Sequence, residues 1–272
     1  MKNIILNNEI EIPAIGFGVF QTDSGAQTEN AVKWALESGY RNIDTASIYG
    51  NEESVGRAIR ESGISREEVF LTSKLWNDDI RSGKAEEAFN KSLERLQTDY
   101  LDLYLIHWPA EGYQKAWKVL EKLYLEKKIR AIGVSNFERH HLEELDKTAE
   151  VRPMVNQIES NPAFQNTELI HYCLGRGMAV QAWSPLGGKG TSLLTNECLA
   201  ELGTKYGKSA AQIVIRWHMQ RNVIPLPKSV NENRIRSNIE VTDFRLSEED
   251  MARIRTLDEK KRVGADPDNF NF

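Results

Sequence analysis

The chain of 272 residues contains 40% hydrophobic and 28% charged residues, which is typical of a globular protein with a sizeable core. Thirty-five basic against 40 acidic side chains give a formal net charge of −5, so neither nucleic acid nor an anionic membrane is expected as the main partner. No apolar run reaches the roughly 18 residues that a membrane-spanning helix needs.

The cysteines and the first residues predict a cytoplasmic protein. Cys173 and Cys198 form no CxxC pair, so neither a disulfide framework nor a zinc site is expected. The start, MKNIILNNEI, turns polar by Asn7 and lacks the apolar core and cleavage site of a signal peptide. No low-complexity linker divides the chain, so we expect residues 1–272 to form a single domain.

A β-hairpin is predicted first, at IILNNEIEIP, where Asn7 and Asn8 suit a tight turn. Eight short apolar or β-branched runs follow, in the order AIGFG, YRNID, VFLTSK, YLDLYLIH, RAIGVSN, PMVNQIE, MAVQAWS and NVIPLPKS. Between them, apolar residues recur with helical spacing. The clearest sets are Ala85, Ala88, Phe89, Leu93 and Leu96, then Ala116, Trp117, Leu120, Leu123 and Tyr124, then Ala210, Ile213, Val214 and Trp217.

Eight strand-and-helix units at this length predict a (β/α)8 TIM barrel, in which a helix covers each parallel strand. A doubly wound open sheet is the competing fold. Its dinucleotide-binding fingerprint is missing, because GFGVFQ has Gly16 and Gly18 but Gln21 in place of a third glycine. The barrel is therefore favoured.

Polar and aromatic residues lie at or near the ends of the last seven runs. They are Asp44, Lys74, His107, Ser135 with Asn136, Gln157, Trp183 and Lys228. In a barrel all these ends lie on one face, where such enzymes place their chemistry.

Asp44 and Tyr49 lie on one predicted loop, where the ordinary interpretation is a turn cap and a half-buried anchor. A phenol with a pKa near 10 is a poor proton donor at neutral pH unless a cation stabilises its phenolate. Lys74 could be that cation, kept charged and oriented by Asp44. His107 would add a hydrogen-bond donor to a carbonyl oxygen.

The segments GYRNIDTASIYGNE, TSKLWN, DLYLIHWP, AIGVSNF, VNQIE, SPLG and PKS occur in this order. With them the chain resembles the aldo-keto reductase family over essentially its whole length, most closely its diketogluconate reductase and prostaglandin F synthase type. Seven segments in register, each at a predicted strand end, are far more specific than any one of them.

The resemblance implies a carbonyl reductase that uses NADPH, with Tyr49 as general acid, tuned by Lys74 and Asp44, and with His107 positioning the carbonyl. It implies that the nicotinamide is held by Ser135, Asn136, Gln157 and Trp183. Ser184 and Leu186, with the following GGKG, match the stretch along the pyrophosphate. The adenosine end is matched by Lys228, Ser229 and Arg234, at the 2′-phosphate, and by Asn238, at the adenine.

A lysine and an arginine close together in a net-acidic protein also suit a phosphate monoester on physical grounds. Two solvated surface charges are the alternative. Two departures from the family pattern bear on this region. Ser160 and Asn161 replace a bulky residue and a histidine after NQIE, and Ser237 stands where many relatives carry glutamate beside the adenine.

Phe20, Trp76, Trp108 and the final DPDNFNF match positions that line the substrate pocket in relatives, so an apolar wall is expected. The alternative is that these aromatic residues belong to the core. No metal site is expected: His140 and His141 are adjacent and should point in different directions on a helix, and His171 and His218 lack ligand-spaced partners.

Two other functions compete with a reductase of small-molecule carbonyl compounds. A Schiff-base aldolase using Lys74 would leave Ser135, Gln157 and Arg234 without a role. A non-catalytic regulatory or binding protein on the same barrel would not need the four catalytic positions. By analogy with the family we expect a monomer.

Overall fold

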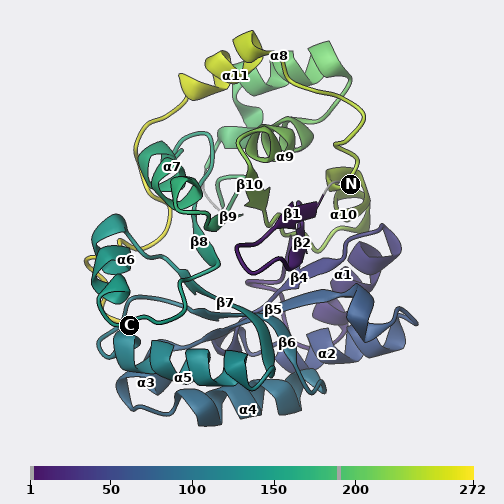
Figure 1. Ribbon diagram of the computed structural model, residues 1–272. Helices are drawn as coiled ribbons and strands as arrows, with labels where there is room; N and C mark the ends of the chain where they lie inside the picture. Colours follow the sequence, from purple (N-terminus) through teal and green to yellow (C-terminus); the bar gives the residue numbers. More distant parts are fainter. Residues whose placement is uncertain (1–2, 189–190) are drawn as a thin grey trace.

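The computed structural model describes residues 3–188 and 191–272. It confirms the (β/α)8 barrel and the N-terminal hairpin (Figure 1). The hairpin strands are β1 (Asn3–Ile5) and β2 (Glu11–Pro13). The barrel strands are β3 (Phe17–Gly18), β4 (Asn42–Asp44), β5 (Phe70–Leu75), β6 (Leu101–Ile106), β7 (Ile129–Ser135), β8 (Val155–Glu159), β9 (Ala179–Trp183) and β10 (Val223–Pro225).

The helices alternate with these strands and lie outside them. They are α1 (Ala26–Glu37), α2 (Glu52–Glu61), α3 (Asn77–Arg81), α4 (Ala85–Leu96), α5 (Tyr113–Leu125), α6 (Arg139–Asp146), α7 (Thr167–Gly175), α8 (Glu197–Tyr206), α9 (Ala210–Gln220), α10 (Glu232–Asn238) and α11 (Glu248–Arg255). In the described ranges, no helix combines the length and apolarity needed to cross a membrane.

The barrel strands pair in chain order from β3 to β10, and every pair is parallel. Backbone hydrogen bonds from Gly16 to Pro225 (3.0 Å) and from Gly18 to Pro227 (3.1 Å) join the last strand to the first. This order never reverses, which excludes the doubly wound sheet that competed with the barrel.

The strands are buried on both faces because helices cover their outer side. All six residues of β6, LDLYLI, are buried, as expected for a parallel strand packed on both sides. Two of the three predicted helical faces pack in the main core with this sheet: Ala88 and Phe89 of α4 and Trp117 and Leu120 of α5 are buried there.

The hairpin covers the amino-terminal end of the barrel. The Asn7 amide donates to the carbonyl of Pro153 (3.4 Å), and the Asn8 amide donates to that of Arg130 (3.0 Å). Ile12 of β2 is fully buried. The opposite end, where the strands finish, is therefore the face available for a site.

A second, smaller core lies between α8, α9 and α11, which group together at the top of Figure 1. Leu199, Leu202, Trp217 and Ile254 are fully buried in it. From α11 the chain returns along α7 and α6 to the carboxyl-terminal face of the barrel (Figure 1).

Candidate active site

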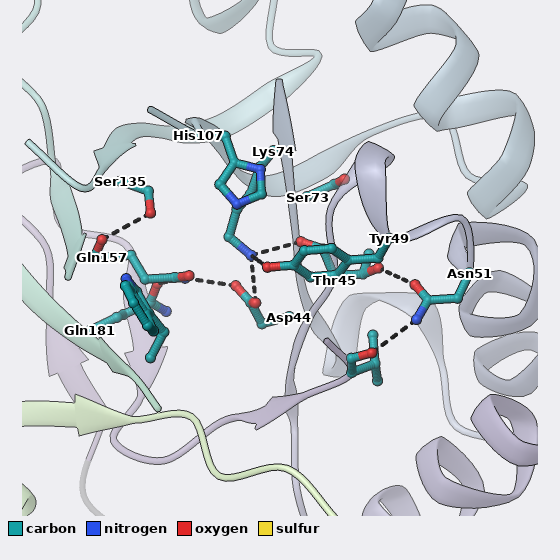
Figure 2. Close-up of polar contacts among 12 residues, drawn as sticks. Asp44, Thr45, Tyr49, Asn51, Ser73, Lys74, His107, Ser135, Gln157 and Gln181 are labelled. Atoms are coloured by element: carbon teal, nitrogen blue, oxygen red, sulfur yellow. Dashed lines mark hydrogen bonds and ion pairs between the residues drawn. The ribbon is translucent and has the colours of Figure 1, made fainter. Parts of the chain in front are cut away.

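Four predicted residues meet where β4, β5 and β6 end. Asp44 is the last residue of β4, Lys74 is the penultimate residue of β5, and His107 follows β6 directly. Tyr49 ends a 3-10 turn, Ser47–Tyr49, in the loop after β4. Figure 2 shows Asp44, Tyr49 and Lys74 directed toward one another, with His107 beside Lys74.

The Lys74 ammonium makes three hydrogen bonds and is completely buried. It donates to the Asp44 carboxylate at 2.6 Å, to the Thr45 carbonyl at 2.9 Å and to the Tyr49 hydroxyl at 3.4 Å. The ammonium also lies 5.0 Å from the centre of the Tyr49 ring. All three of its donor positions are therefore used.

The same contacts shift the pKa values of this group. Burial acts to lower the pKa of Lys74, but the charges of Asp44 and Tyr49 outweigh it, so the pKa is raised and the amine stays protonated. Burial raises the pKa of Tyr49, while the Lys74 ammonium acts to lower it. The direction of the Lys74 effect is as the sequence predicted, although burial is the larger influence.

His107 is held as a neutral imidazole. Burial and, secondarily, the Lys74 charge hold its pKa well below the usual value. Its ring lies edge-on to the Tyr49 ring, with 5.7 Å between centroids. A neutral imidazole keeps one N–H, so it can donate a hydrogen bond without carrying a charge.

Asn51, which the sequence did not single out, fixes the loop that carries Tyr49. Its fully buried amide donates to the carbonyl of Val19 (2.9 Å), and its oxygen accepts the Thr45 hydroxyl (2.8 Å). The loop after β4 is thus tied to the end of β3. Asn51 directly precedes α2, and asparagine is common at helix starts, which was the available signal in the sequence.

The residues expected around a nicotinamide form a connected polar row across β7, β8 and β9. Ser135 donates to the carbonyl of Gln157 at 2.9 Å, and the Asn136 amide donates to the carbonyl of His107 at 3.0 Å. The Trp183 indole N–H donates to the Asn136 side chain at 2.7 Å. Asn136 has φ 62°, a left-handed conformation that asparagine tolerates better than most residues.

Gln157 links this row to the group formed by Asp44, Lys74 and Tyr49. Its amide donates to the second oxygen of Asp44 at 2.7 Å and also to Gln181 at 2.9 Å. Gln181 is fully buried and lies opposite Gln157 in the β8–β9 register. Gln181 was not among the predicted site residues, although a glutamine inside the apolar run MAVQAWS was a usable signal.

The remaining predicted cofactor residues lie after β9 and β10. Lys228 and Ser229 are half-buried, Arg234 is exposed on α10, and Asn238 is buried at the end of that helix. The Arg234 guanidinium makes no ion pair or hydrogen bond with any residue in 3–188 or 191–272.

Ser184 and Leu186 are half-buried in the loop that follows β9. Ser184 has φ 46°, and Gly187 and Gly188 have φ 90° and 70°, so the backbone folds sharply here. Lys189 and Gly190, the second half of GGKG, lie outside the described residues.

The departures from the family pattern have local structural partners. Ser160 and Asn161 are buried in a turn after β8, where Ser160 donates to the Gln165 carbonyl (3.1 Å) and Asn161 accepts from the Ala163 N–H (3.0 Å). Ser237 donates to the Arg234 carbonyl (3.2 Å) within α10. Each side chain therefore bonds within its own segment.

Aromatic rings gather beside His107, where the sequence predicted a pocket wall. Trp76 lies edge-on to His107 (5.2 Å between centroids) and stacks on Phe272 (5.7 Å, 8° between planes). Trp108 contacts Phe272 at 5.2 Å and is almost completely buried. Phe20 is 55% exposed and packs on Tyr49 at 4.9 Å, so it lies at the rim and is not a core residue.

The segment after α11 is fastened near Trp183. The Glu159 carboxylate accepts the backbone N–H groups of Val263 (2.6 Å) and Gly264 (3.0 Å). A Cβ on Gly264 would lie 2.3 Å from the Trp183 ring, so the backbone can approach this ring only because the residue is glycine. The final residues are thereby directed toward the aromatic wall.

One expectation about histidines is wrong. His140 and His141 do not point apart, because their rings lie 4.0 Å apart and both reach Asp268. Both residues lie in the first turn of α6, where Asp268 of the final segment approaches from outside. Sequence spacing within α6 could not reveal that third partner.

Residues 14–259 match the model of the aldo/keto reductase family. The chain is 52% identical to a 9,11-endoperoxide prostaglandin H2 reductase of Trypanosoma cruzi (strain CL Brener) over 98% of this chain and 95% of that one. It is also 52% identical to a glyoxal reductase of Bacillus subtilis (strain 168) over 98% and 96%. A Bombyx mori aldo-keto reductase solved in complex with NADP superposes with a TM-score of 0.91 at 37% identity, covering 98% of this chain and 96% of that one.

Proposed function

This chain belongs to the aldo/keto reductase family, and we propose that it reduces aldehydes and ketones to alcohols with NADPH, using Tyr49 as the general acid. The observation that carries the proposal is the Tyr49 hydroxyl held 3.4 Å from the Lys74 ammonium, next to a neutral His107.

The residues present fit the cofactor. The Arg234 guanidinium has no partner among the described residues, so it is free to pair with a 2′-phosphate. Lys228, half-buried nearby in sequence, would add a second positive charge. Gln157, Ser135 and Asn136 carry amide and hydroxyl groups that would hold the nicotinamide carboxamide.

When bound, NADPH supplies the hydride that is added to the carbonyl carbon. Tyr49 donates its phenolic proton to the carbonyl oxygen as negative charge develops there. The Lys74 ammonium stabilises the phenolate that remains, and Asp44 keeps Lys74 oriented and charged. His107, as a neutral donor, positions the carbonyl oxygen and stabilises its charge.

The pocket wall favours apolar or aromatic carbonyl compounds. Phe20 packs on Tyr49, Trp76 packs on His107 and Phe272 stacks on Trp76, so aromatic rings border both groups. Such surface excludes water from the reacting groups, which strengthens the Lys74 and His107 interactions with developing charge.

The competing functions fit less well. A Schiff-base lysine must be a neutral, accessible amine, whereas Lys74 is fully buried, makes three hydrogen bonds and has a raised pKa. A purely regulatory barrel would have no need for a buried ion pair directed at the hydroxyl of a half-buried tyrosine. Both features support an enzyme.

The test is the loss of NADPH absorbance when purified protein is mixed with glyoxal or an aromatic aldehyde. We expect NADPH oxidation with a stoichiometric alcohol product, and none without protein. An aldolase would instead be inactivated by borohydride in the presence of its carbonyl substrate, through reduction of the Lys74 adduct. No NADPH oxidation with either class of aldehyde would refute the proposal.

A further inference from the structure

A group of three metal-ligating side chains lies outside the candidate active site. His140 Nε2 lies 2.8 Å from Asp268 Oδ1, and His141 Nε2 lies 3.4 Å from the same oxygen. One ligand atom from each residue falls within 4.8 Å of the other two. Two residues come from α6 and the third from the segment after α11.

We propose that His140, His141 and Asp268 bind a divalent transition-metal ion, with Zn²⁺ as the best-suited candidate, and so fasten the final segment to α6. Two imidazole nitrogens and one carboxylate oxygen are ligands that Zn²⁺ accepts, with a fourth position left for water. Ligands about 2.0–2.1 Å from a tetrahedral ion lie roughly 3.3 Å apart. The His141–Asp268 distance already matches, and the His140–Asp268 distance needs to open slightly.

The surroundings allow a cation to enter. The His140 and Asp268 side chains are 59% and 51% exposed, so an ion can reach them from solvent. The neighbouring arginines are paired elsewhere: Arg139 with Glu143 at 2.7 Å, and Arg262 with Glu138. These pairs neutralise the positive charges that would otherwise repel an ion.

His141 also takes part in the N-terminal cap of α6. Its Nδ1 accepts the backbone N–H of Glu138 at 3.2 Å, capping α6. Metal binding through Nε2 would require the ring proton to be on Nδ1, where it would break this hydrogen bond, so the metal would compete with the cap.

The position of Asp268 connects this site to the pocket wall. A turn in which the Asp268 N–H bonds to the Asp266 carboxylate (3.0 Å) presents its side chain to α6. Phe272, four residues further on, stacks on Trp76, which in turn contacts His107. Figure 1 shows this yellow segment beside α6. A bound ion would therefore restrain the aromatic residues that cover the pocket.

The experiment is a titration of the full-length, chelator-treated protein with ZnCl₂ by calorimetry, repeated with CoCl₂ by visible absorbance. The variants are His140→Ala and Asp268→Asn. Both wild-type side chains are exposed, and neither substitution removes the hydrogen bond by which His141 caps α6. The matched control is His171→Ala, an exposed histidine on α7. Circular dichroism of each protein checks its fold.

We expect one ion per chain in the wild type and in His171→Ala. Each of the other variants should bind at least about tenfold more weakly, since loss of even an outer-shell partner costs 10–100-fold in metal affinity. Zn²⁺ should also slow proteolysis after residue 264 in the wild type but not in Asp268→Asn. Wild-type affinity in folded His140→Ala and Asp268→Asn, or no stoichiometric binding by the wild type, would overturn the proposal.

Discussion

The Lys74 ammonium donates a 2.6 Å hydrogen bond to the Asp44 carboxylate, and both side chains are buried inside the barrel. Removing one member of such a pair leaves an uncompensated buried charge, which costs about 3–5 kcal/mol. The Asp44–Lys74 pair is therefore expected to stabilise the fold as well as to take part in the proposed catalysis. Experiments must separate its effect on stability from its effect on activity.

We expect Lys74→Met to lose nearly all reductase activity at neutral pH, because the phenolate of Tyr49 loses its stabilising charge. Asp44→Asn should be affected less, since Lys74 keeps its bonds to Thr45 and Tyr49. Steady-state kinetics with NADPH and an aldehyde measure both effects.

The double variant Asp44→Asn/Lys74→Met separates catalysis from folding. It removes both charges, so it should melt at a higher temperature than Lys74→Met alone while remaining inactive. Lys91→Met, which breaks an exposed pair with Glu87, is the matched control and should keep wild-type stability and rate. Recovery of activity in the double variant would show that Lys74 is only a structural residue.

Tyr49→Phe keeps the ring and its contact with Phe20 but removes the proton donor. Turnover should fall by roughly 10² to 10⁴, the usual contribution of a general acid, with NADPH affinity little changed. Fluorescence titration measures the affinity. Tyr172→Phe, remote on α7, should behave as the wild type, and a wild-type rate in Tyr49→Phe would exclude its assigned role.

The sequence predicted the barrel and the grouping of the proposed catalytic residues because both follow from local patterns. Each strand run, and the polar residue near its end, could be recognised within a few positions, and the barrel topology then brings those ends together. Asp44, Lys74 and His107 needed no further information to be placed on one face.

Contacts that depend on the path of loops and of the final segment could not be predicted in this way. Asp268 meets His140, and Phe272 stacks on Trp76, only because Glu159 and Gly264 direct the chain after α11 across the barrel face. The pairing of Gln157 with Asp44 spans 113 positions and depends on rotamers inside the barrel. Hydrophobic periodicity carries no information about either.

The pH dependence of stability should reflect a buried histidine in α9. Burial, with a smaller effect of Arg221, lowers the pKa of His218 to about 3, below the unfolded value near 6.5. Between these pKa values the unfolded chain binds a proton that the folded protein does not. The contribution of the neutral, buried His218 ring to the free energy of unfolding is therefore complete above about pH 6.5 and declines as the pH falls toward 3.

We expect the melting temperature to fall between pH 7 and pH 5 in the wild type and to fall less in His218→Gln, which has no proton to bind. The comparison uses the change with pH within each protein, so a general destabilisation by the substitution cancels. His171→Gln, on the surface of α7, is the control and should keep the wild-type slope. An identical slope in His218→Gln would show that His218 does not contribute to this linkage.

The preference for NADPH should depend on Arg234. NADPH differs from NADH by a 2′-phosphate that carries close to two negative charges at pH 7. The Arg234 guanidinium, which has no partner among the described residues, can grip it with two hydrogen bonds. Arg234→Ala should weaken NADPH binding by roughly ten- to a hundredfold and leave NADH binding nearly unchanged.

Arg236, in the same helix, is already paired with Glu37 (3.0 Å) and Glu232 (2.7 Å), so Arg236→Ala should affect neither cofactor. Fluorescence titration of both cofactors against the three proteins measures this difference. Equal losses for NADH and NADPH in Arg234→Ala would mean that Arg234 supports α10 or the adenine and does not select the phosphate.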